Sequence, residues 1–200
     1  MTWLTPGGVA AAVLVGGAVA WGLRWVALIP LFTFLVSGSL LARRAGVAAA
    51  PRTARQVVAN GAVAAIAAVA HLWPAAAGAI AAAAADTWAT EIGSRSRQPP
   101  RLITTGEPVP HGTSGGITVL GTAGGAVGAL MIALFCAYAA PELRWRGCWV
   151  VAISGVTGMI ADSVLGATLQ ARRWLDNDAV NLLGSLTGAL TAAAGATLWT

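Results

Sequence analysis

Charged residues are scarce in this sequence of 200 residues. They make up 10% of the chain, whereas hydrophobic residues make up 57% and the mean hydropathy is +0.74. A soluble domain of this size needs charge on roughly a quarter of its residues. The scarcity therefore excludes a soluble globular domain and implies a surface that faces lipid. Abundant alanine and glycine favour close packing of helices inside a membrane.

Lysine is absent, so all twelve basic residues behind the net charge of +5 are arginine. Without lysine the chain cannot carry the GxxxxGK[ST] phosphate loop. The arginines lie in short gaps between apolar runs, and they form no basic stretch with interleaved aromatic residues that would hold a nucleic acid strand. We therefore assign them to membrane orientation and lipid headgroups, and we expect no nucleic-acid partner.

Cysteine and histidine are nearly absent too. Cys136 and Cys148 lie in or beside apolar segments, which is typical of packing residues. The sequence contains no CxxC pair and no HExxH. The paired DxxD or DxxxD signatures of membrane prenyltransferases and alcohol phosphotransferases are also missing.

Long apolar runs dominate what remains, and they predict an all-α, polytopic transmembrane bundle of six to seven helices. We treat residues 1–200 as one integral membrane domain, with N-terminal helices and a basic loop in 1–54 and the motifs in 55–185. The predicted helices are Leu4–Leu23, Trp25–Ala42, Val57–Trp73, Ala75–Ala89, Gly115–Tyr138, Gly147–Leu169 and Ala179–Leu198.

The arginines are distributed unevenly between the two ends of such a bundle. Nine fall in the gaps after the second, fourth and sixth runs, whereas Arg24, Arg144 and Arg146 fall at the other end. Because basic loops stay in the cytoplasm, the count predicts a cytoplasmic N-terminus, an outside C-terminus and cytoplasmic motif loops.

Carboxylates beside or within apolar helices are the main candidates for chemistry, since they are costly in lipid. Asp86 and Glu91 follow an alanine run, and Asp162 lies deep inside another apolar run. If that run is helical, Gly166 and Gln170 share a face with Asp162. A simpler reading of Asp86 and Glu91 is that they end a helix at the membrane surface and pair with Arg95.

Three carboxamides, Asn60, Asn177 and Asn181, lie near the same predicted boundary as the carboxylates. We expect both groups to converge there and to suit Mg²⁺, which prefers oxygen ligands together with substrate phosphates. Alternatively, Asn60 and Asn181 form hydrogen bonds between helices.

The loop after the fourth run holds glycines, hydroxyls and an arginine before a helix start, which favours anion binding. Its two polar stretches are 99–105 and 111–118. Alone, glycines that enter a membrane helix indicate packing, and the overlapping GxxxG spacings of Gly121, Gly124, Gly125 and Gly128 fit that role. His111 alone is an ordinary loop histidine.

Four motifs resemble an integral membrane family that contains plant phytyl-phosphate kinase and transmembrane protein 19, known as domain of unknown function 92. Gln56–Gly61 is similar to its Q-V-x-x-N-G. Asp86–Gly93 is similar to D-T-W-A-S-E-x-G, with Thr90 in place of serine. Pro100–Thr105 and Val109–Gly116 match P-R-L-I-T-T and V-x-x-G-T-N-G-G, with Ser114 in place of asparagine. The fourth stretch is Asp162–Gln170, followed by Asp176–Asn181.

The resemblance implies a membrane kinase that converts an isoprenyl monophosphate into the diphosphate with a nucleoside triphosphate, CTP among the candidates, and Mg²⁺. The implied metal ligands are Asp86, Glu91 and Asp162, which act as catalytic residues together with Arg101. The donor phosphates would contact Arg101, Thr104, Thr105 and the loop residues Gly112, Thr113, Gly115 and Gly116. Asn177 and Asn181 would orient the acceptor, and Asn60 and Gln170 would complete the binding site.

We expect the isoprenyl tail between helices, where Gly121, Gly125 and Gly166 would leave space. A transporter or lipid flippase is the alternative, supported by intramembrane carboxylates and by an echo between Asp86-Thr87 and Asp162-Ser163. A noncatalytic scaffold is a third possibility. An enzyme predicts polar residues at one membrane face, whereas a transporter predicts them near the midplane.

Overall fold

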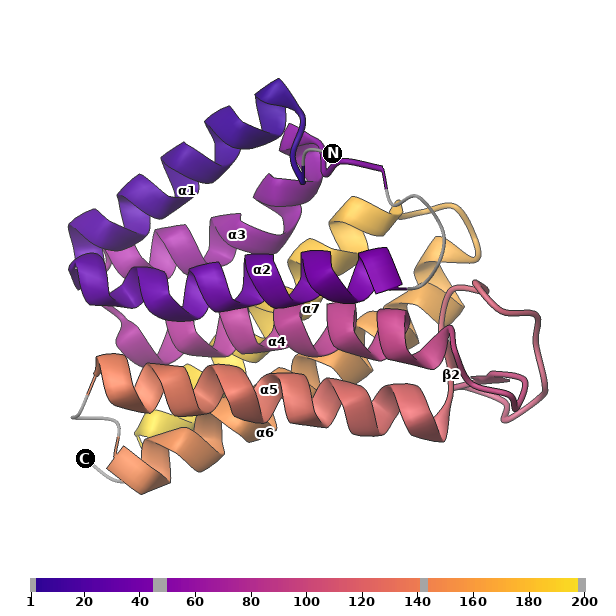
Figure 1. The fold of residues 1–200 in the computed structure, drawn as a ribbon. Helices are drawn as coiled ribbons and strands as arrows, with labels where there is room; N and C mark the ends of the chain where they lie inside the picture. The colour runs from indigo at the N-terminus through magenta and orange to yellow at the C-terminus, as the bar shows by residue number, and fades with distance from the viewer. Residues whose placement is uncertain (1–2, 45–49, 141–143, 198–200) are drawn as a thin grey trace.

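The protein is an up-and-down bundle of helices, seen in a computed structural model that describes residues 3–44, 50–140 and 144–197 (Figure 1). These residues form seven α-helices: α1 (Pro6–Leu23), α2 (Leu28–Arg44), α3 (Ala54–Val69), α4 (Trp73–Gly93), α5 (Val119–Ala139), α6 (Arg144–Leu165) and α7 (Asn177–Ala196). A 3₁₀ turn, Trp25–Ala27, precedes α2, and a π-helical turn, Gly166–Gln170, extends α6.

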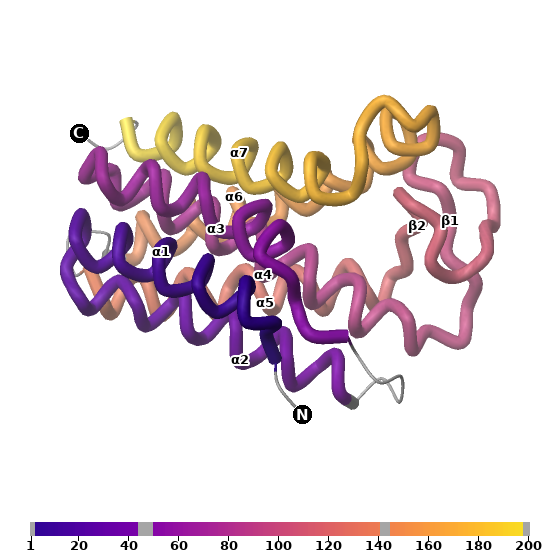
Figure 2. The backbone as a smooth tube through the Cα atoms, turned by 90° about the horizontal axis from the view of Figure 1, so that it is seen from above, coloured from indigo at the N-terminus to yellow at the C-terminus, as the bar shows by residue number. Residues whose placement is uncertain are grey.

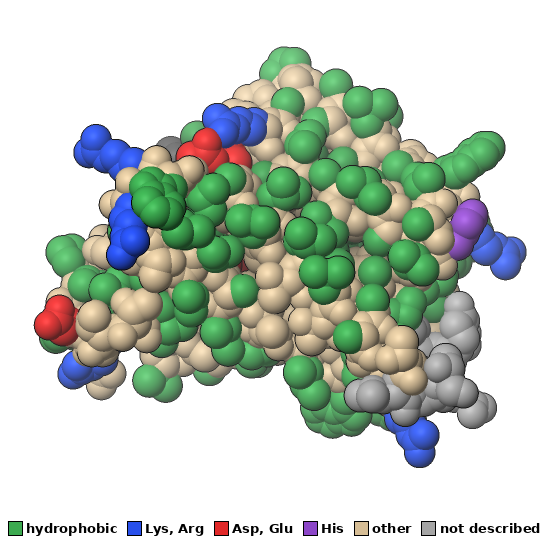
Figure 3. Space-filling model, turned by 180° about the vertical axis from the view of Figure 1, so that it is seen from behind, with side chains coloured by type: hydrophobic (Ala, Val, Ile, Leu, Met, Phe, Trp, Pro, Cys, Tyr) green, Lys and Arg blue, Asp and Glu red, His purple; other side chains and the backbone are tan. Residues whose placement is uncertain are grey.

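The predicted all-α membrane bundle is confirmed. Among the described residues five stretches are long and apolar enough to cross a membrane: Pro6–Leu23, Trp25–Arg43, Val119–Ala139, Trp145–Gln170 and Asn177–Ala196. A small antiparallel sheet of β1 (Arg101–Leu102) and β2 (Gly116–Ile117) projects from one end. On the face drawn in Figure 3, charged side chains gather towards the two ends, and mostly apolar surface lies between them.

Helix α4 is the centre of the bundle, because it packs against α2, α3, α5, α6 and α7. Every residue from Ala75 to Ala85 is buried, and nine of these eleven are alanine. A helix that is apolar all round is a buried helix. Its small side chains let five neighbours approach one axis closely.

Glycines bring these neighbours into contact. A Cβ atom built on Gly78 of α4 would lie 2.4 Å from the carbonyl oxygen of Gly188 in α7. A Cβ on Gly125 of α5 would lie 2.3 Å from Sδ of Met159, and one on Gly128 would lie 2.9 Å from the ring of Trp88. The GxxxG glycines of α5 therefore pack helices together. The expectation that Gly125 leaves space for a lipid tail is wrong, because side chains of α4 and α6 fill that space.

Several helix boundaries differ from the predicted ones, and two of the differences have a clear local cause. The third helix was predicted to extend to Trp73, but Trp73 and Pro74 form the first turn of α4, where the missing N–H of proline costs nothing. α3 already ends at Val69. α5 begins at Val119, four residues after the predicted Gly115, because Gly116 and Ile117 pair with β1 instead.

One end of the bundle gathers the polar sequence. Figures 1 and 2 place the β1–β2 sheet and the turn between α6 and α7 at this end, which we call the loop end. Helices α1, α3, α5 and α7 begin there, each capped by a side chain: Thr5, Thr53, Thr118 and Asp176, respectively. Helix N-termini carry partial positive charge. The loop end also holds the nine arginines that lie in the gaps after the second, fourth and sixth apolar runs. Its positive charge therefore favours anions.

Candidate functional site

A cavity of about 530 Å³ opens at the loop end. Its walls come from the first turns of α3, α5 and α7, the last turns of α4 and α6, and the loop 100–118. Polar side chains supply much of the lining, among them Arg52, Gln56, Asn60, Asp86, Thr87, Thr90, Glu91, Ser94, Asp162, Ser163, Gln170, Asn177 and Asn181. Segments far apart in sequence therefore contribute to one space.

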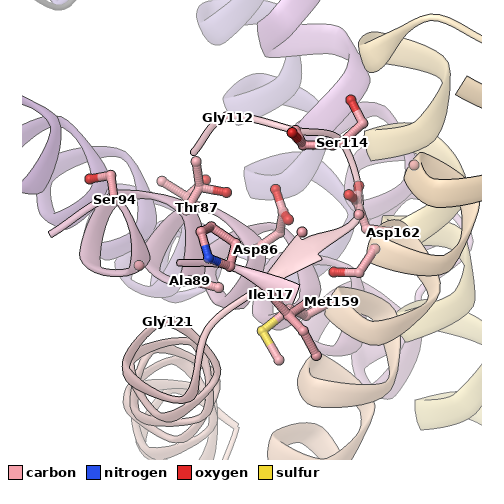
Figure 4. Close-up of a pocket in the computed structure, with 18 of the residues that line it drawn as sticks. Asp86, Thr87, Ala89, Ser94, Gly112, Ser114, Ile117, Gly121, Met159 and Asp162 are labelled. Atoms are coloured by element: carbon pink, nitrogen blue, oxygen red, sulfur yellow. The ribbon is translucent and has the colours of Figure 1, made fainter. Parts of the chain in front are cut away.

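Two aspartates meet inside this cavity. The side chains of Asp86 in α4 and Asp162 in α6 line the same narrow space and lie close enough for their charges to interact, and Figure 4 shows them beside the loop that carries Gly112 and Ser114. Two unit charges about 4 Å apart repel by about 4 kcal/mol at an effective dielectric constant of 20. Such a pair is stable only when a proton or a cation lies between the carboxylates.

Small residues hold the aspartate pair in place. A Cβ on Gly184 of α7 would lie 3.2 Å from Cβ of Asp162, so the glycine leaves room for the carboxylate. One turn earlier in α6, a Cβ on Gly158 would lie 2.4 Å from Cβ of Ala82. The approach of α6 to both α4 and α7 therefore fixes the position of Asp162.

Amide and hydroxyl oxygens surround the aspartates. Asn60 and Asn181 line the same narrow space as both carboxylates, together with Ser185. The amide nitrogen of Asn60 donates to the carbonyl of Gln56 at 2.9 Å, which leaves its side-chain oxygen free to face the pair. The buried hydroxyl of Ser185 has no hydrogen-bond partner among the described residues. The group therefore offers several side-chain oxygen atoms that could serve as metal ligands.

Glu91 does not join the aspartates. It lines the cavity one and a half turns further along α4, where Arg52 and Arg95 lie close enough to act on its charge. Within the described ranges, no three His, Cys, Asp or Glu side chains lie together in a way that could hold a metal ion. The structure therefore separates Glu91 from the other two predicted metal ligands.

The loop 100–118 covers the mouth of the cavity in a fixed conformation. Pairing of β1 with β2 is extended by the bond from the Ile103 amide to the Gly115 carbonyl, 2.9 Å long. Gly115 adopts φ +77°, and a Cβ there would lie 2.5 Å from Cβ of Ala167 in the π-helical turn. Gly166, one residue earlier in this turn, packs against the backbone of Ser114 and Gly115. Only glycine allows the loop this contact with α6.

Arg52 is the residue that the sequence reasoning missed. It precedes the first motif, yet it is half-buried and lines the cavity. Its guanidinium lies 5.2 Å from the ring centre of Phe34, and a Cβ on Gly38 would lie 2.8 Å from Nη2. Burial lowers the pKa of Arg52 and the charge of Glu91 opposes this, but arginine stays protonated at neutral pH.

No hydrogen bond or ion pair joins the Arg52 guanidinium to any of the residues in 3–44, 50–140 or 144–197. A half-buried cation without a hydrogen-bond acceptor is costly, so the arrangement favours an anionic ligand.

The fourteen site residues predicted from the sequence divide into two groups. The structure brings eleven of them to the cavity: Asn60, Asp86, Glu91, Gly112, Thr113, Gly115, Gly116, Asp162, Gln170, Asn177 and Asn181. The other three, Arg101, Thr104 and Thr105, are exposed and do not line it. Arg101 donates to the carbonyl of Gly106 at 2.7 Å, which turns its guanidinium along the loop.

Ion pairs join α3 to α7 beside the cavity. Arg55 binds both Asp176 and, at 2.9 Å, Asp178. The backbone N–H of Ala179 lowers the pKa of Asp176, and the hydrogen bond and charge of Arg55 lower it further. Exposed ion pairs contribute little stability. Their effect here is to hold the two helix starts that carry Asn60 and Asn181 next to each other.

Comparison with known proteins places the chain among membrane proteins. The family model described as "Integral membrane protein DUF92" matches residues 1–189. The chain is 40% identical over 111 residues to "Uncharacterized membrane protein MJ0933" of Methanocaldococcus jannaschii, covering 56% of this chain and 46% of that one. It is 42% identical over 95 residues to "Protein PGR" of Arabidopsis thaliana, covering 42% and 33%.

A more distant relative is "Protein VTE6, chloroplastic" of Arabidopsis thaliana, 27% identical over 110 residues, covering 54% of this chain and 33% of that one. The chain thus spans less than half the length of each of these relatives. No solved structure matches it.

Proposed function

Because this chain belongs to the integral membrane protein family DUF92, we propose that it is a membrane kinase that adds a phosphoryl group from a nucleoside triphosphate to an isoprenyl monophosphate. CTP is the first donor to test. The observation that carries the proposal is the contact of Asp86 with Asp162 in a cavity that also contains the Arg52 guanidinium. The two neighbouring carboxylates can bind a metal ion, and the guanidinium of Arg52 can bind a phosphate coordinated to that ion.

The residues around the aspartates fit Mg²⁺. Asp86 and Asp162 would hold the ion, and the side-chain oxygens of Asn60 and Asn181 are near enough to contribute directly or through water. The unpartnered Ser185 hydroxyl lines the same narrow space and adds one more oxygen beside the aspartates. A bound Mg²⁺ would neutralise the charge that develops on the transferred phosphoryl group.

Another part of the cavity lining supplies positive charge for phosphates. Arg52 projects into the cavity there, and the first turns of α3, α5 and α7 point at the same space. The backbone N–H of Gly115 and the hydroxyl of Ser114 lie in the covering loop, whereas the N–H of Gly116 and the hydroxyl of Thr113 already donate to the carbonyls of Thr113 and Pro110. Phosphoryl transfer depends mainly on such positioning and charge. An acceptor monophosphate is already a nucleophile, so the step needs no strong general base, and the proposal assigns no role to His111, which also lines the cavity.

The position of the cavity along the helices favours an enzyme over a transporter. Asp86 is seven residues before the end of the 21-residue α4, which corresponds to about 10 Å from the loop end. Asp162 lies in the last quarter of α6. The polar cluster is thus near one end of the bundle, where a nucleotide can enter from water.

A direct assay tests the proposal. Purified protein in proteoliposomes is incubated with phytyl monophosphate, Mg²⁺ and labelled CTP or ATP, and labelled phytyl diphosphate is measured. Diphosphate that requires both Mg²⁺ and intact Asp86 supports the kinase. Movement of the lipid phosphate across the bilayer without diphosphate formation would instead establish the flippase.

A further inference from the structure

A second, narrow cavity of about 80 Å³ lies between α1, α2 and α3. Its lining is apolar along most of its length: Ala12, Val15, Gly16, Leu28, Leu31, Phe32, Phe34, Leu35 and Val57, with Gly61. Figure 1 shows α1 and α2 diverging from their short connection towards the loop end. This groove therefore lies where the two helices separate.

The groove and the main cavity share three residues: Arg52, Gln56 and Asn60. All three belong to the start of α3 or the residues just before it, so the two spaces meet at this point. A polar chamber here continues into an apolar channel, and the unpaired guanidinium of Arg52 stands at the junction. Phe32 also lines the groove and is 57% exposed, so this wall of the groove borders the surrounding lipid.

The glycine-rich face of α5 offers no comparable space. A Cβ on Gly121 would lie 2.7 Å from the Ala89 carbonyl oxygen, and one on Gly124 would lie 2.7 Å from Ile92. In contrast, a Cβ on Gly16 in the groove meets only Leu28, at an ordinary 3.7 Å.

We propose that the groove between α1, α2 and α3 holds the first part of the hydrocarbon tail of an isoprenyl monophosphate, with its phosphate on Arg52. This inference rests on the proposed function for the identity of the lipid. The tail enters the groove beside Gln56 and Asn60 and leaves it past Phe32 into the bilayer. The phosphate at Arg52 then faces the aspartate pair across the main cavity. The groove therefore selects a single linear chain with an anionic head.

Photo-crosslinking tests the path of the tail without requiring turnover. Protein in proteoliposomes is irradiated with an isoprenyl monophosphate that carries a diazirine on its tail, and labelled peptides are identified by mass spectrometry. We expect labels on α1, α2 and α3 that excess phytyl monophosphate removes and phytol does not. Labels confined to α5 and α6, or no label that phytyl monophosphate displaces, would overturn the inference.

A matched pair of variants tests the groove itself. Ala12→Trp fills it, whereas Ala10→Trp adds the same ring to an exposed position of α1 on the opposite side of the helix. We expect Ala12→Trp to weaken groove labelling and to lower kcat/KM for phytyl monophosphate by about tenfold. Turnover of isopentenyl monophosphate, which has little tail, should persist. Equal effects of the two variants at equal thermal stability would contradict the groove.

The outcomes separate this inference from the kinase proposal. Groove labelling with no diphosphate formed from any nucleoside triphosphate would refute the kinase and keep the lipid site. Diphosphate formation with labels elsewhere would refute the groove and keep the kinase.

Discussion

Replacement of Asp162 by asparagine separates a metal-binding role from a structural one. The side chain keeps its size and loses its charge. No arginine pairs with Asp162 in the described parts of the chain, where the salt bridges are those of Arg55. Its close polar neighbour is Asp86. The variant therefore strands no cation, and it removes a repulsion of up to about 4 kcal/mol between two ionised carboxylates.

The expected result has two parts. Without Mg²⁺, the thermal stability of Asp162→Asn in detergent stays level or rises, because a neutral amide costs less than a carboxylate inside a helix bundle. With Mg²⁺ at a hundredfold excess over Kd, the wild type gains about 2.7 kcal/mol that the variant does not gain. Diphosphate formation falls by about 10²–10³, as when a phosphoryl-transfer site loses one electrostatic contact.

Glu107→Gln provides the control, because Glu107 is exposed in the loop and does not line the cavity. The Glu107→Gln variant should have the same thermal stability as the wild type and the same gain in stability on addition of Mg²⁺. An Asp162→Asn protein that is unstable without metal yet turns over normally per folded molecule would refute the metal assignment.

Three further predictions concern the rest of the cavity and its orientation. Arg52→Gln should lower kcat/KM at least tenfold, since a charged hydrogen bond to phosphate contributes about 1.5–3 kcal/mol; equal loss in the exposed control Arg97→Gln would contradict this. Gly115→Ala and Gly106→Ala both place a side chain at positive φ, at a cost of about 1–2 kcal/mol. Only a side chain at position 115 also meets Ala167, so the melting temperature and activity of Gly115→Ala should fall further than those of Gly106→Ala. Equal losses would exclude the contact between the loop and Ala167. A cysteine at exposed Gln98 should react with a membrane-impermeant maleimide only from the cytoplasmic side, and labelling from outside would reverse the orientation.

The sequence allowed us to predict that Asp86 and Asp162 lie close together. One helix lies between the two that carry them, so both aspartates belong to the same end of the bundle. An up-and-down chain returns to the same end after each pair of helices, so polar residues at the end of α4 and near the end of α6 lie on the same side. Helical spacing also predicted that Gln170 shares a helix face with Asp162. Both residues line the cavity, although Gln170 belongs to the π-helical turn Gly166–Gln170 that follows α6. Regular periodicity and topology were sufficient for these residues.

Arg52 and Arg101 could not be predicted in the same way, because irregular backbone places them. Arg52 is positioned by tertiary bonds of its backbone, from Arg52 N–H to the Trp3 carbonyl and from Thr5 N–H to the Arg52 carbonyl. Arg101 is directed along the loop by the Gly106 carbonyl. Neither partner follows from sequence spacing.

The glycines show a different limit of sequence reasoning. A Cβ on Gly16 would meet Leu28 at an ordinary 3.7 Å and one on Gly125 would lie 2.3 Å from a sulfur atom, yet both are small residues in apolar helices. Only the packing of neighbouring helices distinguishes a glycine that leaves a space from one that closes a contact.

The alanine-rich α4 has a consequence for how the protein enters its membrane. α4 is not among the five described helices that are apolar enough to cross alone, and α3, which precedes it, is short for a span. The translocon favours strongly apolar segments, so we expect α3 and α4 to insert together as a hairpin that the other helices retain. Asp86 then stays in a weakly anchored segment until α6 and α7 have been synthesised. We therefore expect a competent site only after α6 and α7 have joined the bundle.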